Sequence, residues 1–216
     1  MGQIFIDNTV GTKDDPELFK QEMAYLSYID EHVANVTKAY AELFAGIKDQ
    51  DINDIGIDVS EFRDALRKLK KQIPLHDASK YEDEEFYGYR LHFNATAKET
   101  ERLSTDEQFA IDAKENWDRA WAHHYKHNWH HPQAWLWLDE NNGKYTIREV
   151  PRSEALEMPL NYVLEMICDW HAMDIKFNTK LKDWYTSSKS YTERNSMHPN
   201  TKQIVDKLVD WVSTKE

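Results

Sequence analysis

Apolar residues recur at three- and four-residue steps along most of the chain, which is the pattern of amphipathic helices. The first stripe predicts a long helix that begins at Asp15-Pro16, because proline is tolerated in a first turn. Its apolar positions are Phe19, Met23, Leu26, Ile29, Val33, Val36, Tyr40, Leu43 and Ile47. A polar stretch over 48–58 ends it. A second stripe over 59–73 predicts a helix that Pro74 stops, because the residue before proline avoids helical geometry.

Two further helices are predicted in the middle of the chain, before the C-terminal part. One is expected from His76 to about Phe93. Another is expected after Thr105, which resembles an N-cap because Gln108 follows three residues later. Its inward face carries Phe109, Ala113, Trp117, Ala120 and His124.

The C-terminal part predicts two more helices and a short hairpin. Asn142-Gly143, within 139–150, is a strong signal for a hairpin turn. Pro159 opens a helix that is apolar nearly all round and therefore buried, and Pro199 opens a last amphipathic helix. We expect an all-α, single-domain helical bundle over 1–216, with an irregular N-terminal segment over 1–15 and a short β-hairpin near 139–150.

Composition narrows the function classes. The 216 residues carry 27 Lys and Arg against 39 Asp and Glu, a formal charge of −12, which argues against binding to a nucleic-acid duplex. No apolar run approaches the roughly 18 residues of a membrane span, and we find no signal peptide at the N-terminus. A single cysteine, Cys168, excludes an internal disulfide and a cysteine-rich zinc module. We therefore expect a cytoplasmic protein that does not bind membranes; the oligomeric state is left open.

The sharpest local signal is the segment from His76 to Lys80, which reads His-Asp-Ala-Ser-Lys. An imidazole and a carboxylate at adjacent positions can face one metal ion, and Lys80 could bind a phosphate beside it. The alternative is that His76 and Asp77 cap a helix after Pro74, since aspartate is a good N-cap.

Two further candidates lie on helices far away in the sequence. His32 is at the edge of the first apolar stripe, and Asp169 lies on the nearly all-apolar helix. A carboxylate there is costly to bury unless it is paired, protonated or bound to a metal. Glu165, one turn before Asp169, is a candidate to orient His32 or a bound water.

The order His, then His-Asp, then Asp resembles that of the HD-domain metal-dependent phosphohydrolase superfamily, with His32, His76, Asp77 and Asp169 in the ligand positions. Several stretches over about 20–210, including Ala120 to His124 and Glu165 to Trp170, also resemble an uncharacterised bacterial and phage family. The HD resemblance implies a divalent transition metal, of which Mn, Fe, Co, Ni or Zn suit such mixed nitrogen and oxygen ligands.

Five of the ten histidines fall between His123 and His131. Helical phase places His124 on the inward face, whereas His123 and His130 continue the polar face. Pro132 discourages helical geometry at His131, which could therefore turn back towards the site. Some HD-type families hold a second ion with two additional histidines, and the resemblance points to His124 and His131. The alternative is a surface cluster without a ligand role.

These residues predict a metal-dependent phosphohydrolase acting on a nucleotide or another small phosphate ester. The bound ion would activate a water molecule. Asp77, or a nearby histidine such as His130, would manage its proton, and Lys80 would bind the phosphate. Two alternatives remain open at this point: a dinuclear iron oxygenase on the same scaffold, and a non-catalytic protein-binding module with a remnant metal site.

Overall fold

The structure is a computed structural model that describes residues 15–136, 138–141, 144–147 and 155–215, the two short strand segments by their backbone alone. Residues 1–14 of the expected irregular segment lie outside this part. Helix α1 (Pro16–Leu43) begins as predicted, and the side chain of Asp15 accepts hydrogen bonds from the backbone N–H groups of Glu17 and Leu18. The helix ends at Leu43 rather than near Ile47.

The polar stretch over 48–58 contains a short helix that the sequence pattern did not predict, α2 (Asp49–Ile55). Its buried Ile52 and Ile55 pack in the core, and Gly56 ends it with a left-handed backbone at φ 75°. Helix α3 (Val59–Gln72) follows the predicted range closely, and Pro74 lies just after it in a 3₁₀ turn.

The chain between α3 and α6 differs from the prediction. A 3₁₀ turn, η1 (Ile73–Leu75), precedes His76, and the helix expected from His76 is instead a second 3₁₀ turn, η2 (Ala78–Tyr81), followed by α4 (Asp83–Phe93). Thr105 is the last residue of α5 (Ala97–Thr105), and Asp106 is the N-cap of α6 (Glu107–His127). The side chain of Asp106 accepts from the backbone N–H of Phe109, so the signal for a helix start was one residue off.

After α6, the chain forms η3 (Pro132–Trp135) and then two short strands, β1 (Leu138–Asn141) and β2 (Lys144–Ile147). The strands pair antiparallel with Asn141 opposite Lys144; residues 142–143 and 148–150 of the range where a hairpin was expected lie outside the described residues. The C-terminal part forms α7 (Leu160–Phe177), α8 (Leu181–Thr186), η5 (Ser188–Ser190), α9 (Tyr191–Ser196) and α10 (Pro199–Val212).

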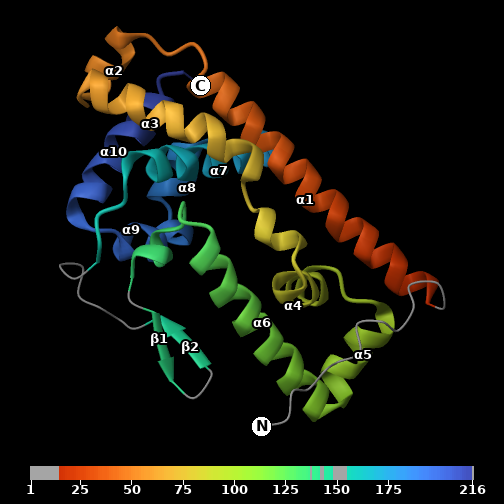
Figure 1. Ribbon diagram of the computed structural model, residues 1–216. Helices are drawn as coiled ribbons and strands as arrows, with labels where there is room; N and C mark the ends of the chain where they lie inside the picture. Colours follow the sequence, from red (N-terminus) through yellow and green to blue (C-terminus); the bar gives the residue numbers. More distant parts are fainter. Residues whose placement is uncertain (1–14, 137, 142–143, 148–154, 216) are drawn as a thin grey trace.

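Helix α1 runs past two groups of helices (Figure 1). Its C-terminal half packs in a large apolar cluster with α2, α3, α7 and α10, to which it contributes Val36, Ala39 and Leu43. Its N-terminal half contributes Tyr25 and Ile29 to a smaller cluster with α4 and α6. His32 therefore lies on α1 between the two apolar clusters.

Helices α4 and α6 approach very closely at Gly88. A Cβ atom at this position would lie 2.7 Å from the backbone oxygen of Asn116 and 2.8 Å from the Cβ of Ala120. Only glycine permits this separation, since atoms of the α6 backbone cannot move aside as a flexible side chain can. The close approach brings Glu85 of α4 next to His123 and His124 of α6.

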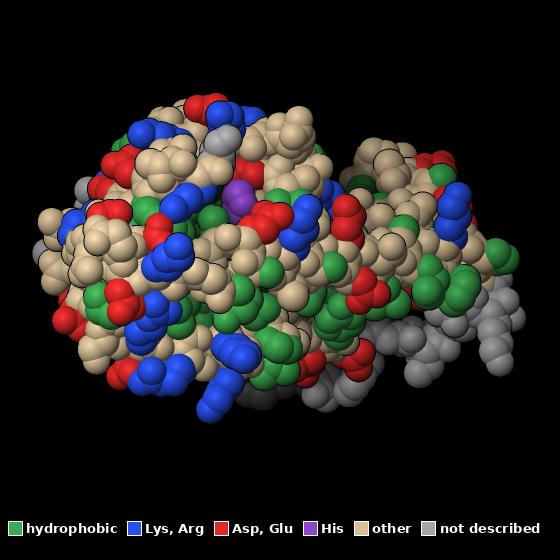
Figure 2. Space-filling view, turned by 90° about the horizontal axis from the view of Figure 1, so that it is seen from above, with side chains coloured by type: hydrophobic (Ala, Val, Ile, Leu, Met, Phe, Trp, Pro, Cys, Tyr) green, Lys and Arg blue, Asp and Glu red, His purple; other side chains and the backbone are tan. Residues whose placement is uncertain are grey.

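Acidic and basic side chains are interspersed over the face of the molecule in Figure 2. In the described part of the chain, no helix combines the length and the apolar character needed to cross a bilayer.

Candidate metal centre

Four side chains from three separate segments converge beside the middle of α1. Nε2 of His32 lies 3.1 Å from Oδ1 of Asp169, 3.3 Å from Nε2 of His76 and 3.6 Å from Oδ2 of Asp77. Nε2 of His76 lies 3.6 Å from the same Asp77 oxygen and 3.8 Å from Oδ1 of Asp169. Two imidazoles and two carboxylates thus present one atom each to a common point, which we call the first position.

The spacing of these atoms fits a metal ion. Ligand atoms at roughly 2.1 Å from one ion lie about 3.0–3.4 Å apart in octahedral or tetrahedral geometry. The distances of 3.1–3.8 Å between the donor atoms are close to this range and slightly wider. Small side-chain movements would therefore complete the first position around an ion.

The backbone between η1 and η2 brings His76 and Asp77 to the same place. Asp77 adopts a left-handed conformation at φ 54°, which aspartate tolerates better than most residues. Its side chain makes no hydrogen bond that caps η2. Asp77 therefore occupies the N-cap position of η2 without capping it through its side chain, and the carboxylate faces the donor cluster instead.

A second position adjoins the first through the other oxygen of Asp77. Oδ1 of Asp77 lies 3.5 Å from Nε2 of His124 and 3.6 Å from Nε2 of His130. Nε2 of His124 in turn lies 2.8 Å from Nε2 of His131. Because each oxygen of Asp77 faces a different set of histidines, this one carboxylate could bridge two ions.

Two buried atoms in this region lack hydrogen-bond partners among the described residues. They are Oδ1 of Asp77 and Nε2 of His130, which face one another at 3.6 Å. An unpaired buried polar atom is costly, and a bound cation would satisfy the carboxylate oxygen of Asp77. The donor set therefore fits a metal.

Two buried glutamates orient the histidines from behind. Oε1 of Glu165 lies 3.1 Å from Nδ1 of His76 and 3.5 Å from Nδ1 of His130, and Oε2 of Glu85 lies 3.0 Å from Nδ1 of His124. An ionised carboxylate only accepts, so each Nδ1 donates and each Nε2 keeps its lone pair towards the cluster. Carboxylates behind imidazoles are the usual arrangement around metal-binding histidines.

The charge balance favours neutral imidazoles at the second position. Burial lowers the pKa of His124, and burial together with His130 and His124 holds the pKa of His131 well below its usual value. Neutral imidazole is the form that binds metals. At the first position, burial alone would lower the pKa of His76, but the carboxylates around it raise it overall.

The carboxylates of the cluster are held ionised. Burial alone would raise the pKa of Asp77, but Lys80 and the surrounding histidines hold it well below its usual range. The same balance lowers the pKa of Asp169, chiefly through His32, and lowers that of Glu165 to about 2. Nζ of Lys80 lies 2.6 Å from Oδ2 of Asp77, so the ammonium group of Lys80 forms an ion pair with this carboxylate.

A family model matches residues 21–211, which includes every residue of this cluster. The chain belongs to the family of unknown function DUF5662. No curated protein and no solved structure matches it. Membership in DUF5662 assigns no activity, and the geometry of the cluster is what bears on its chemistry.

In this DUF5662 chain, the residues selected from the sequence lie together. Every residue expected to bind metal or to act on a substrate contributes an atom to the cluster. They are His32, His76, Asp77, Lys80, His124, His130, His131 and Asp169. The predicted placement of His130 on the polar face of a helix was wrong. Helix α6 ends at His127, and the side chain of His130 is buried, with 1% exposed.

Glu85 was not predicted from the sequence, and Glu165 makes a different contact from the predicted one. Glu165 contacts His76 and His130, whereas we expected it to orient His32 or a water. Glu85 lies one turn before the buried Tyr89, and this shared helix face was the signal available for its burial. Its partners His123 and His124 come from α6, and no spacing along the chain predicts that contact.

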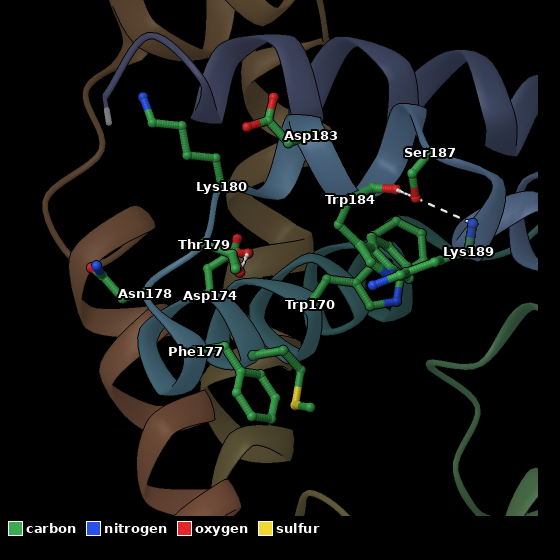
Figure 3. Close-up of a pocket in the computed structure, with 11 residues that line it drawn as sticks. Trp170, Asp174, Phe177, Asn178, Thr179, Lys180, Asp183, Trp184, Ser187 and Lys189 are labelled. Atoms are coloured by element: carbon green, nitrogen blue, oxygen red, sulfur yellow. Dashed lines mark hydrogen bonds between the residues drawn. The ribbon is translucent and has the colours of Figure 1, made fainter.

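A cavity of about 930 Å³ lies away from the cluster, at the C-terminal end of α7 (Figure 3). Trp170, Phe177 and Trp184 line it together with Lys180. None of the cluster residues lines this cavity, so we do not assign the substrate to it.

Proposed function

We propose that this protein is a metal-dependent phosphohydrolase of the HD-domain type that acts on a nucleotide or another small phosphate ester in the cytoplasm. One observation carries the proposal: a half-buried lysine, Lys80, reaches into a cluster of imidazoles and carboxylates that fits one or two divalent ions. An ion site beside a fixed cation is suited to a phosphate group, whose charge both would neutralise.

His32, His76, Asp77 and Asp169 would hold the first ion, and Asp77, His124 and His131 would hold a second. When bound, such an ion lowers the pKa of water and polarises a phosphoryl oxygen. Mn, Fe, Co, Ni and Zn are all compatible with these nitrogen and oxygen ligands.

Lys80 would bind and orient the phosphate. Asp77 beside it raises its pKa despite burial, which keeps the ammonium group charged. Its Nζ atom contacts Oδ2 of Asp77, an oxygen of the first position. An ion bound there would replace Lys80 as the partner of Oδ2 of Asp77. The ammonium group of Lys80 would then be available to bind a phosphoryl oxygen.

His130 would manage the proton of the attacking water. Its Nε2 faces Asp77 and Asp169 without a hydrogen-bond partner among the described residues, and Glu165 lies behind its Nδ1. In the hydrolysis, the water oxygen bonds to phosphorus, Nε2 accepts a proton and the bond to the leaving oxygen breaks. The leaving oxygen takes up a proton from solvent and Nε2 returns its proton to solvent, so a phosphate ester and water yield an alcohol and a phosphate.

The test is phosphate release by untagged protein loaded separately with each candidate metal. The substrates would be nucleoside mono-, di- and triphosphates, cyclic dinucleotides and p-nitrophenyl phosphate. We expect turnover of at least one substrate, lost in Asp77→Ala and Lys80→Ala and kept in His92→Ala, whose side chain stacks on Trp117 outside the cluster. No hydrolysis with any metal would overturn the proposal.

A dinuclear iron oxygenase is a second candidate because the two oxygens of Asp77 face different histidine sets, as a bridging ligand would. Iron-loaded protein should then absorb in the near ultraviolet and consume oxygen in step with substrate loss. Hydrolysis without oxygen uptake would reject this candidate.

A further inference from the structure

We infer that His123, His127 and Glu82 form a separate surface site for a transition metal ion. His123 and His127 lie one turn apart at the C-terminal end of α6, with ring centroids 3.9 Å apart and ring planes at 27°. Ligand atoms of these two histidines and of Glu85 all lie within 4.8 Å of one another. Histidines four residues apart on a helix share one face, so both rings can reach one ion.

Hydrogen bonds fix which nitrogen of each ring is available. Nδ1 of His127 lies 2.8 Å from the backbone oxygen of His123, and a carbonyl oxygen only accepts, so this nitrogen donates. Nδ1 of His123 lies 2.8 Å from Oε1 of Glu85 and donates in the same way. In the neutral form, each histidine therefore keeps the lone pair on Nε2, which is the form that binds a metal.

Glu82 supplies a third donor. Its Oε2 lies 3.9 Å from Nε2 of His123, and its side chain is 55% exposed and free to adjust. Glu85 is not counted as a donor to this ion. It orients His123 through Oε1, and its other oxygen, Oε2, contacts His124 of the donor cluster around Asp77. Two imidazoles and one carboxylate, open to water on the remaining sides, suit Zn²⁺, Ni²⁺ or Cu²⁺.

The surface site is separate from the donor cluster around Asp77, although the two are adjacent. His123 and His127 face outwards, whereas His124 between them is buried and faces Asp77. An ion at the surface site therefore does not depend on Asp77, and this independence can be measured.

The experiment is equilibrium dialysis of untagged protein against Zn²⁺, together with electron paramagnetic resonance of bound Cu²⁺. We expect an additional weaker ion whose affinity falls at least about tenfold in His127→Ala, because loss of a ligand costs no less than loss of a group that orients one. His92→Ala, a partly solvent-facing histidine on α4, should leave this affinity unchanged. The Cu²⁺ signal should show coupling to two imidazole nitrogens, falling to one in His127→Ala.

The surface ion should also be retained in Asp77→Ala, which removes the central bridging ligand. Equal Zn²⁺ binding by wild type and His127→Ala would overturn the inference. Loss of the additional ion in Asp77→Ala would do the same, because the ion would then belong to the central cluster. Neither result depends on whether the protein hydrolyses phosphate esters.

Discussion

Oε1 of Glu165 lies 3.1 Å from Nδ1 of His76, and this contact determines which nitrogen of His76 faces the donor cluster. The glutamate is itself positioned, since Nε2 of Gln72 donates to its other oxygen and Asn161 donates to Gln72. A chain of buried and half-buried hydrogen bonds thus extends from α3 and α7 to a candidate metal ligand.

Glu165→Gln should weaken metal binding about tenfold and Glu165→Ala about 100-fold, within the range known for partners behind metal-binding histidines. Glutamine keeps an oxygen that accepts from Nδ1 of His76, whereas alanine removes the acceptor. Competition with a fluorescent chelator would measure both affinities. Glu101→Gln, on the exposed face of α5, is the matched control; equal affinities in all four proteins would show that Glu165 does not support the metal.

Asp77 should be required for both central ions, because its two oxygens face different sets of histidines. We expect Asp77→Ala to lose two tightly bound ions, and His32→Ala or His124→Ala to lose one each. Elemental analysis after removal of weakly bound metal by a mild chelator would give these numbers, with circular dichroism to verify folding. Loss of both ions in His124→Ala would indicate that the two positions do not fill independently.

Metal removal should lower the thermal stability of the protein. Ligands come from α1, from the turns before α4, from the end of α6 and from α7, so an ion would join elements of both apolar clusters. At an ion concentration 100 times the Kd, binding to the folded state contributes about 2.7 kcal/mol. Calorimetry with and without a chelator would detect the shift in Tm, and Asp77→Ala, which lacks the central ions, should show a smaller shift.

Much of this arrangement was predictable because the periodic stripes of α1, α3, α7 and α10 are long and each buries a continuous face. The breaks between helices were less predictable. The turn at His76-Asp77 has the composition of a helix start, and its left-handed backbone at Asp77 is fixed by contacts with distant segments. Short helices such as α2 owe their stability to burial of a few side chains, which local sequence does not reveal.

The candidate site was likewise predictable only in part from the sequence. Residue type and chain order pointed to His32, His76, Asp77 and Asp169 before any contact was known. The buried state of His130 depends on α6 ending at His127, and the role of Glu85 depends on the approach of α4 to α6 at Gly88. These are tertiary contacts, and one sequence contains no direct record of them.

Gly88→Ala should destabilise the protein and disturb the second metal position. The added methyl group would lie 2.7 Å from the backbone oxygen of Asn116, so α4 and α6 must separate. Overpacking of this kind typically costs about 1–3 kcal/mol. Gly46→Ala is the control, since a Cβ there meets nothing within 4 Å. Urea unfolding would compare the two, and equal stability of both variants would contradict the close approach.

Glu99→Gln should lower stability in a pH-dependent way. Arg90 is 2% exposed and pairs with both oxygens of Glu99, and Oε2 also accepts from the backbone N–H of Thr96. Burial alone would raise the pKa of Glu99, but these bonds lower it overall. A lowered pKa in the folded state means that the ionised form stabilises the protein above the unfolded pKa of about 4.3. This stabilisation is lost as the pH falls through the folded value.

We therefore expect Glu99→Gln to unfold with about 3 kcal/mol less free energy near pH 7, because Arg90 is left buried without its counter-charge. The difference from wild type should shrink as the pH falls below about 4.3, where Glu99 of the unfolded wild-type chain takes up a proton before the folded chain does. Urea unfolding at several pH values would measure it, with Glu101→Gln as the exposed control. A difference that stays constant down to pH 3 would show that the charge of Glu99 does not stabilise the fold.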